Sequence, residues 1–305
     1  ASMTPPRQIS IPNPLPSVGG TRLSHRSPWI YRVATWVFRI RRQLAWLRSG
    51  RVFSTQLEPK SLPFRAHRHS SLLMRKLGNT DPQLQVNKIT NLRVALSCLD
   101  GLLIRPGETF SFCKRVGKPT RQRGFVDGLE LSRGEARRGV GGGICQIANL
   151  LHWLVLHSPL SVLERSQHSF DPFPDDGRII PFGTGAAIFY NYVDYQFENR
   201  TPWTFQLRLW LTGKTLEGDL RCSHELEHKY RVIERNHAFL KIGQNFYRTN
   251  EIWRKKTRKF RSIPESEVLI TRNFALVKYE PKEFVTVEEG AVSVTLPPLT
   301  DSTER

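Results

Sequence analysis

Three consecutive glycines followed at once by an apolar run are the feature that most constrains the fold of this chain: Gly141 to Gly143 stand directly before Ile144, Cys145 and Gln146. Apolar residues then recur at helical spacing until Ser158-Pro159: Ile147, Ala148, Leu151, Leu154 and Val155. Such spacing predicts a buried helix, and glycine allows the tight turn that leads into it. We therefore expect a helix from Ile144 to His157 with Cys145 in its first turn.

This position makes Cys145 a candidate nucleophile. Unpaired N–H groups and the positive end of the helix dipole favour the thiolate, which is the reactive form of cysteine. The glycines at positions 141, 142 and 143 leave room for a substrate backbone, and nearby N–H groups, with the side chain of Gln146, are candidate donors to an oxyanion. The alternative interpretation is a glycine-rich turn capped by a small buried cysteine without chemistry.

A cysteine nucleophile needs a base, and the histidines that follow Cys145 differ in their expected distance from it. His152 lies about 10 Å along the helix axis, so it is expected to pack within the helix. The helix runs about 20 Å one way, and an extended return covers roughly 26 Å by His168, which brings His168 back level with Cys145. This layout is typical of papain-like cysteine enzymes, so His168 is the candidate base. The alternative is a surface histidine at a strand end.

A third residue would orient the histidine. Four aspartates are candidates: Asp171, Asp175, Asp176 and Asp194. We favour Asp194 because it lies on the polar face of a predicted strand. The alternative is that a backbone carbonyl orients His168 and no third side chain exists.

The chain beyond this region has a β pattern. Residues 193–197 and 203–211 alternate apolar and polar side chains on either side of a turn-like Asn-Arg-Thr-Pro stretch, which predicts a hairpin. The chain has 305 residues, of which 39% are hydrophobic, so it can bury a sizeable core. We predict an α+β fold in which the buried cysteine helix packs on a mostly antiparallel sheet, with a β-rich C-terminal third.

The N-terminal part is basic and contains no acidic residue before Glu58. Pro, Gly, Ser and Arg dominate residues 1–27, which predicts a disordered leader. A helix should follow and end near Gly50, with an apolar stripe at helical spacing: Trp29, Val33, Trp36, Val37, Ile40, Leu44 and Leu47. We favour packing of this stripe on the domain core, and the alternative is a surface helix on anionic lipid.

The expected divisions of the chain are the leader over residues 1–27, a helical region over 28–86, a core domain over 87–222 and a β-rich extension over 223–305. The formal net charge of +19 favours polyanionic partners such as an anionic membrane surface or a wall polymer. Nucleic acid is not expected, because the basic run from Arg254 to Arg261 is typical of a solvated face and no nucleic-acid motif accompanies it. The four cysteines lack the spacing of a zinc site, so neither a metal nor a cofactor is expected.

Several motifs together resemble the VanW family. They are Arg105 to Phe112, Val116-Gly117, Gly141 to Gln146, and Leu163-Glu164-Arg165 with His168. The resemblance spans roughly residues 87–197 and implies a link to the cell wall and to glycopeptide (vancomycin) resistance. It also implies similarity to members that look like L,D-transpeptidases, which use the motif cysteine on peptidoglycan stem peptides. Arg165, within the motif, is a candidate for substrate binding.

Under this resemblance Cys145 would attack the carbonyl that precedes a terminal D-Ala, and His168 would carry the proton. A side-chain amine of a second stem peptide would then accept the acyl group. The sequence departs from the family at one place: Gly185 stands where many members have the Asp of a Gly-x-Asp-Ala stretch. The alternative function is a non-catalytic binding protein for a peptidoglycan precursor, or an accessory resistance protein.

The N-terminal sequence predicts neither a secretory signal nor a transmembrane helix, because Arg32 and Arg39 interrupt the apolar stripe. This favours the cytoplasm or the membrane periphery. Transpeptidation occurs outside the membrane, so three alternatives stay open. They are an extracytoplasmic protein whose export signal lies in a longer native chain, unconventional export, and action on a cytoplasmic precursor.

Overall fold

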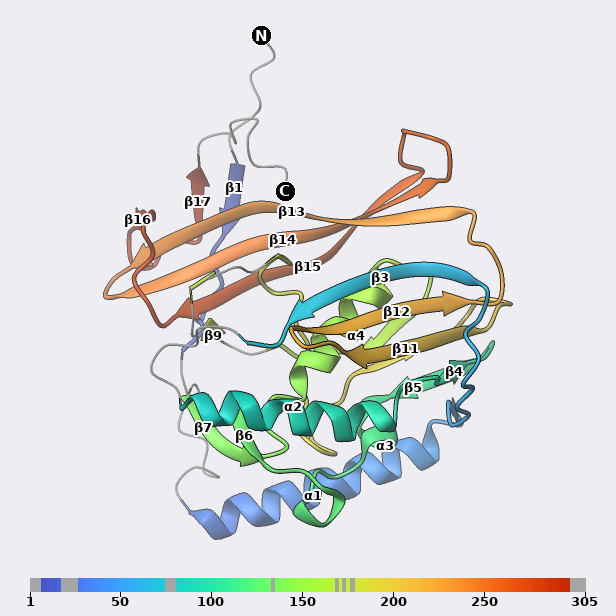
Figure 1. Ribbon diagram of the computed structural model, residues 1–305. Coiled ribbons are helices and arrows are strands. Elements are labelled where there is room, and N and C mark those ends of the chain that lie inside the picture. Colours follow the sequence, from blue (N-terminus) through green and yellow to red (C-terminus); the bar gives the residue numbers. More distant parts are fainter. Residues whose placement is uncertain are drawn as a thin grey trace. The chain divides into compact units, whose positions relative to one another are not determined.

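The computed structural model describes residues 7–17, 27–74, 81–132, 135–167, 170–171, 174–175 and 179–296 (Figure 1). These residues form two compact units. The helical unit, as we call it, contains the described parts of residues 20–168 and 185–229, and the β unit contains those of residues 1–19, 169–184 and 230–305. The predicted α+β class, with mostly antiparallel sheets and a β-rich C-terminal part, is confirmed.

Two four-stranded sheets form the frame of the helical unit. The first has the order β3 (Phe64–Leu72), β12 (Thr215–Cys222), β11 (Phe205–Leu211) and β4 (Leu103–Ile104), and all its pairs are antiparallel. The second has the order β2 (Val52–Phe53), β5 (Glu108–Ser111), β10 (Gln196–Glu198) and β8 (Ser161–Glu164). In this sheet β2 and β5 are parallel, and the other pairs are antiparallel.

The predicted hairpin over residues 193–211 is wrong. β10 pairs with β5 and β8, whereas β11 pairs with β12 and β4. The link between the two strands is held by buried Asn199, whose Nδ2 donates to the carbonyl oxygens of Ile104 at 2.8 Å and Trp203 at 2.6 Å. A side chain that binds a distant strand in this way guides the chain into a different sheet, and the alternation of apolar residues does not reveal it.

The helices of this unit begin where the sequence provides a local start signal. α2 (Pro82–Ser97) starts at an Asp-Pro pair: Asp81 accepts the N–H of Gln83 at 2.9 Å, and Pro82 occupies the first turn, where its missing N–H costs nothing. The short α3 (Phe112–Val116) starts at Ser111, which accepts the N–H of Lys114 at 3.1 Å. α4 (Cys145–Leu156) begins one residue after the predicted start.

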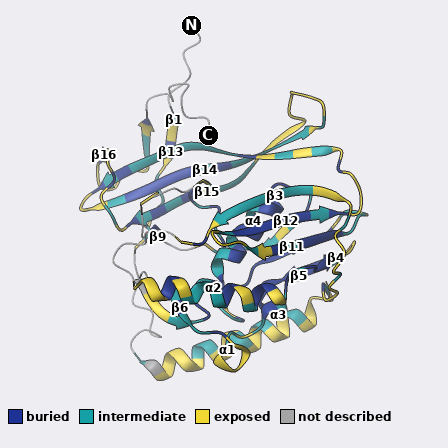
Figure 2. Ribbon diagram, in the orientation of Figure 1, coloured by how far each residue is buried: buried dark blue, intermediate teal, exposed yellow. Residues whose placement is uncertain are grey.

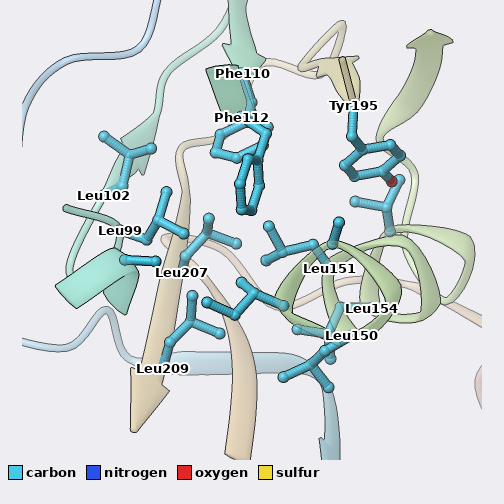
Figure 3. Close-up of a cluster of buried hydrophobic side chains, with 14 of the residues drawn as sticks. Leu99, Leu102, Phe110, Phe112, Leu150, Leu151, Leu154, Tyr195, Leu207 and Leu209 are labelled. Carbon is cyan, nitrogen blue, oxygen red and sulfur yellow. The ribbon is translucent and has the colours of Figure 1, made fainter. Parts of the chain in front are cut away.

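α4 packs on β3 and β12 and lies in the main hydrophobic core. Figure 3 shows Leu151 and Leu154 of α4 facing Leu207 and Leu209 of β11. Burying each leucine side chain of this kind contributes about 1.5–3 kcal/mol to stability. The helix that carries Cys145 is therefore held rigidly from one side by the sheet.

α1 (Pro28–Arg48) forms as predicted, but its apolar stripe is exposed (Figure 2). The exposed fraction is 37% or more for every member of the stripe: Trp29, Val33, Trp36, Val37, Ile40, Leu44 and Leu47. The expectation that this stripe packs on the core is wrong, because periodicity identifies an apolar face but not what covers it. None of the helices in the described ranges has both the length and the apolar character needed to cross a membrane.

The β unit is a five-stranded sheet with a separate two-stranded ribbon. The sheet has the order β16 (Val285–Val287), β13 (His228–Ile242), β14 (Asn245–Arg258), β15 (Ser266–Val277) and β9 (Phe170–Asp171). The ribbon pairs β1 (Arg7–Ser10) with β17 (Ser293–Leu296). Residues 7–10 are thus ordered in a strand, although they lie within the predicted disordered leader. The basic run from Arg254 to Arg261 covers the end of β14 and the turn beyond it.

Candidate functional site

The hairpin of β6 (Asp127–Ser132) and β7 (Glu135–Val140) leads into the glycine turn. After β7 the backbone of Gly142 crosses that of Gly128 in β6. A Cβ atom on Gly142 would lie 2.2 Å from the carbonyl carbon of Gly128, and one on Gly128 would lie 2.3 Å from the carbonyl oxygen of Gly142. Only glycine fits on both sides of this contact, so these two glycines allow the hairpin and the turn to touch.

Asn91 of α2 joins the two backbones at this crossing. Its Nδ2 donates to the carbonyl oxygens of Gly142 at 2.9 Å and Val126 at 3.0 Å, and its Oδ1 accepts the N–H of Val126 at 2.8 Å. The side chain is fully buried. A fully paired buried amide of this kind fixes the path of the chain immediately before Cys145.

Cys145 is the first residue of α4, and two backbone N–H groups at this helix start have no acceptor in another described residue. The N–H groups of Ile144 and Gln146 donate to backbone carbonyls three residues earlier, at 3.4 and 3.1 Å. Within the described parts of the chain, the N–H group of Gly143 donates no hydrogen bond, and that of Cys145 has only its own thiol as a partner. The helix start therefore places these two donors beside the cysteine, as an oxyanion site requires.

Cys145 is partly exposed as a residue, and its Sγ lies 3.8 Å from the carbonyl oxygen of Ile188, to which the S–H donates. Burial raises the pKa of the Cys145 thiol above its ordinary value, and the nearby charge of Glu130 raises it further. The helix start favours the thiolate, but desolvation is the largest effect on this thiol and raises its pKa. The cysteine needs a base before it can act as a nucleophile.

Gln146 contacts β3 instead of the space in front of the thiol. Its Nε2 donates to Ser71 Oγ and to the carbonyl oxygen of Leu72, both at 2.8 Å. These two bonds use both protons of the amide, so Gln146 ties the start of α4 to the sheet and has no proton left for an oxyanion in this conformation.

The segment 185–188, which we call the wall, packs on the face of α4 that carries Cys145 and Asn149. Asn149, one turn after Cys145, accepts the N–H of Ala186 at 2.7 Å through Oδ1, and Arg165 donates through Nη1 to the carbonyl oxygen of Gly185 at 2.8 Å. A Cβ atom on Gly185 would lie 2.9 Å from Asn149 Oδ1. An acid at position 185 would therefore require Asn149 to move. Arg165 holds this wall in place through that bond, and its binding of substrate stays a prediction.

His152 lies deeper along the same side of α4, as expected for a packed residue. Its Nδ1 is 3.1 Å from the hydroxyl of Tyr195, and both side chains are buried. Burial and the charge of Arg165 lower the pKa of His152 to about 3, so its ring is neutral at neutral pH. His152 and Tyr195 thus form a buried polar pair two helical turns beyond Cys145, on the same side of α4.

The predicted base and orienting acids are not brought together among the described residues. His168 and Asp176 lie outside the described residues. Asp171 and Asp175 belong to the β unit, where both form ion pairs with Arg248.

Asp194 is a buried carboxylate with four donors and no described contact with a histidine. It accepts hydrogen bonds from Ser111 Oγ at 2.6 Å, the N–H of Cys113 at 2.9 Å, the N–H of Tyr195 at 2.8 Å and Gln196 Nε2 at 2.9 Å. Its described contacts tie β5, α3 and β10 together. No contact within the described ranges joins it to Cys145.

Three residues near the cysteine escaped the sequence analysis: Asn91, Glu130 and Asn149. Asn149 had a readable signal, because it shares a helix face with Cys145 at a spacing of four residues. The sequence contained no such signal for Asn91 and Glu130. They lie in α2 and β6, far from Cys145 in the sequence, so residue spacing does not indicate their contacts with the site.

Comparison with known proteins agrees with these motifs. Residues 87–221 match the family described as VanW like protein. The vancomycin B-type resistance protein VanW of Enterococcus faecalis is 28% identical over 245 residues, which cover 79% of this chain and 88% of that protein. The uncharacterized protein YoaR of Bacillus subtilis is 28% identical over 144 residues, which cover 47% of this chain and 46% of that protein.

No solved structure matches the chain. The matched region contains four parts of the site: Asn91, which joins the two crossing backbones, the glycine turn, Cys145 and Arg165. The E. faecalis protein matches across most of both chains, beyond the limits of this region. On the motifs, the matched region and this relative, residues 87–221 form a VanW-like region.

Proposed function

We propose that this chain is a cysteine acyltransferase that acts on peptidoglycan stem peptides, in the manner of an L,D-transpeptidase, and serves in glycopeptide resistance. The observation that carries the proposal is the start of α4, where a partly exposed cysteine stands beside the N–H groups of Gly143 and Cys145, which have no acceptor in another described residue. The match of residues 87–221 to VanW like protein supports it, as does the name of the similar E. faecalis protein, which refers to vancomycin resistance.

In the first step Cys145 Sγ attacks the carbonyl carbon that precedes the terminal D-Ala of a donor stem peptide. An S–C bond forms, the C–N bond to D-Ala breaks, and the leaving amine takes up the proton that the thiol has lost. The N–H groups of Gly143 and Cys145 would stabilise the negative charge on the carbonyl oxygen of the tetrahedral intermediate. The product of this step is a thioester on Cys145.

In the second step a side-chain amine of another stem peptide attacks the thioester. An amide bond forms, the C–S bond breaks, and the amine's proton returns to the sulfur. Both steps need a proton carrier, because burial raises the pKa of the Cys145 thiol and keeps it protonated at neutral pH. We assign this role to His168, which follows Arg165 in the family motif. Arg165 and Gln146 act as positioning residues through their bonds to the site's walls.

The test is to incubate the full chain with a disaccharide-tetrapeptide that ends in D-Ala and to measure the intact mass. The wild type should gain the mass of the donor minus D-Ala, and hydroxylamine should remove it. Cys145→Ser should gain none, whereas Cys98→Ser, which removes another partly exposed thiol, should behave like the wild type. Folded wild type without an adduct, or an adduct retained by Cys145→Ser, contradicts the proposal.

A second candidate function, non-catalytic binding of a peptidoglycan precursor, is favoured by the raised pKa of the Cys145 thiol. In that case the wild type and Cys145→Ser would both bind the tetrapeptide with the same Kd and neither would form an adduct. Calorimetric titration of both proteins with the same muropeptide, together with the mass measurement, distinguishes a non-catalytic binding protein from an enzyme.

A further inference from the structure

α1 presents a continuous apolar face to solvent. Trp29, Trp36 and Leu47 are 72%, 64% and 80% exposed, and the face spans the helix from its first turn to its last. Seven large hydrophobic residues make up this face, and all of them are exposed: Trp29, Val33, Trp36, Val37, Ile40, Leu44 and Leu47. An exposed apolar patch of this extent on a well-formed helix marks an interaction surface.

This face lies opposite the side by which α1 contacts the helical unit. Arg42 forms a two-pronged ion pair with Glu164 at 2.5 Å, and Trp46 packs on the core and lies 6.2 Å from the ring of Phe53. Val33 is nine residues before Arg42 and Val37 is nine before Trp46. Nine residues are two and a half helical turns, so each valine points away from the docked side. α1 is thus attached along one side and open along the other.

The charge on α1 is entirely positive. The helix contains five arginines and no acidic residue. Arg42 is paired with Glu164, and Arg39 lies over the ring of Tyr190 at 5.6 Å. The other three are Arg32, Arg41 and Arg48; they are exposed, and no ion pair to them occurs in the described parts of the chain. They border the apolar face on both sides, since Arg32 and Arg41 lie on opposite flanks at 100° per residue.

We propose that α1 lies in the headgroup region of an anionic bilayer with its apolar face inserted. Anionic lipid complements this helix, because α1 combines an apolar stripe and two exposed tryptophans with flanking arginines and contains no acidic residue. A membrane-surface helix inserts its apolar side about 5–10 Å deep, and tryptophan favours this interfacial layer. The inference uses α1 alone and does not depend on the chemistry of Cys145.

Cosedimentation of the full chain with vesicles tests it. We expect binding to phosphatidylcholine vesicles that contain a third phosphatidylglycerol and little binding to pure phosphatidylcholine. Leu44→Glu should lower the partition coefficient at least tenfold. Val86→Glu is the matched control: it places the same charge on an exposed valine of α2, in the same unit, and should bind like the wild type. Arg41→Ala should weaken binding about fivefold at low salt.

Three outcomes would overturn the proposal. The wild type stays in the supernatant with anionic vesicles, or Leu44→Glu binds them as well as the wild type does, or the apolar face is covered by a second copy of the chain. Sedimentation equilibrium without lipid detects the last case as a dimer that Leu44→Glu dissociates. Circular dichroism melting of each variant confirms the fold, which substitutions at exposed positions should leave unchanged.

Discussion

Two effects on the thiol of Cys145 oppose each other. The start of α4 supplies N–H groups and the positive end of a helix dipole, which favour the thiolate by about 0.3–1 kcal/mol at ordinary exposure. Burial of the thiol and the charge of Glu130 act in the other direction, and burial is the larger. The thiol is therefore protonated in the resting protein, and it becomes a reactive nucleophile only when a base removes its proton.

The pH dependence of alkylation follows from this balance. Because the pKa of the Cys145 thiol is raised, the thiolate fraction is small at pH 7 and grows about tenfold per pH unit. The rate of iodoacetamide labelling at Cys145, mapped by mass spectrometry, should thus rise from pH 7 to pH 9 without reaching a plateau. A plateau at or below pH 7 would show a thiolate stabilised in the resting protein and contradict the effect of burial.

Asn91 is the residue on which the geometry before Cys145 depends. Asn91→Ala leaves the carbonyl oxygens of Val126 and Gly142 and the N–H of Val126 without their partner. A buried group left unpaired costs about 1–3 kcal/mol, so the free energy of unfolding should fall by roughly 2–4 kcal/mol. Asn87→Ala, which removes one bond to Asp127 from the same helix, should cost about 1 kcal/mol. Urea denaturation of both variants measures the difference. Equal losses of unfolding free energy would contradict the role of Asn91 in joining the two backbones.

At the scale of elements, α1 and α4 show what periodicity can and cannot predict. Both helices were located within two residues of their ends, because apolar spacing and flanking Gly or Pro are local signals. Their surroundings were not equally predictable: α4 is covered by β3 and β12, while the stripe of α1 faces solvent. The strands show the same limit, since β10 and β11 were found as strands and their pairing was not.

Matched leucine truncations on the two helices measure this difference. Leu151→Ala removes a fully buried side chain of α4 and should lower the free energy of unfolding by about 2–5 kcal/mol. Leu47→Ala removes a side chain of α1 that is 80% exposed and should change it by less than about 0.5 kcal/mol. Chemical denaturation without lipid gives both values. A large loss for Leu47→Ala would mean that the face of α1 is covered in solution.

Across the whole molecule, the parts of the site that are close together in the sequence were predictable. The parts formed by segments far apart in the sequence were not. Cys145 and its glycine turn lie within one short stretch, so composition and spacing indicate them. The partner of Gly142, Asn91, is 51 residues away, and Arg165 binds Gly185 across 20 residues. Such contacts depend on how the hairpin of β6 and β7 and the wall at 185–188 fold back on α4. His168 as the base stays a prediction.

Buried histidines should make the whole protein sensitive to acid. Burial lowers the pKa of His67 and His152 to about 3 in the helical unit, and that of His237 to about 4 in the β unit. These rings are neutral when folded, whereas in the unfolded chain they take up protons near pH 6.5. The unfolded state therefore binds more protons as pH falls, and the stability present above about pH 6.5 is lost progressively down to pH 3–4.

Urea denaturation at pH 7.5 and pH 5.0 tests this prediction. Buried His152 alone should lower the free energy of unfolding by about 2 kcal/mol between these values. His67→Phe keeps a ring to stack on His157, 3.9 Å away in the wild type, but cannot take up a proton, so it should reduce the loss in acid. His224→Phe, at an exposed ring stacked on Trp203, is the control and should leave the loss unchanged. Equal stability of the wild type at both pH values would show that these histidines are open to water and protonated in the folded protein.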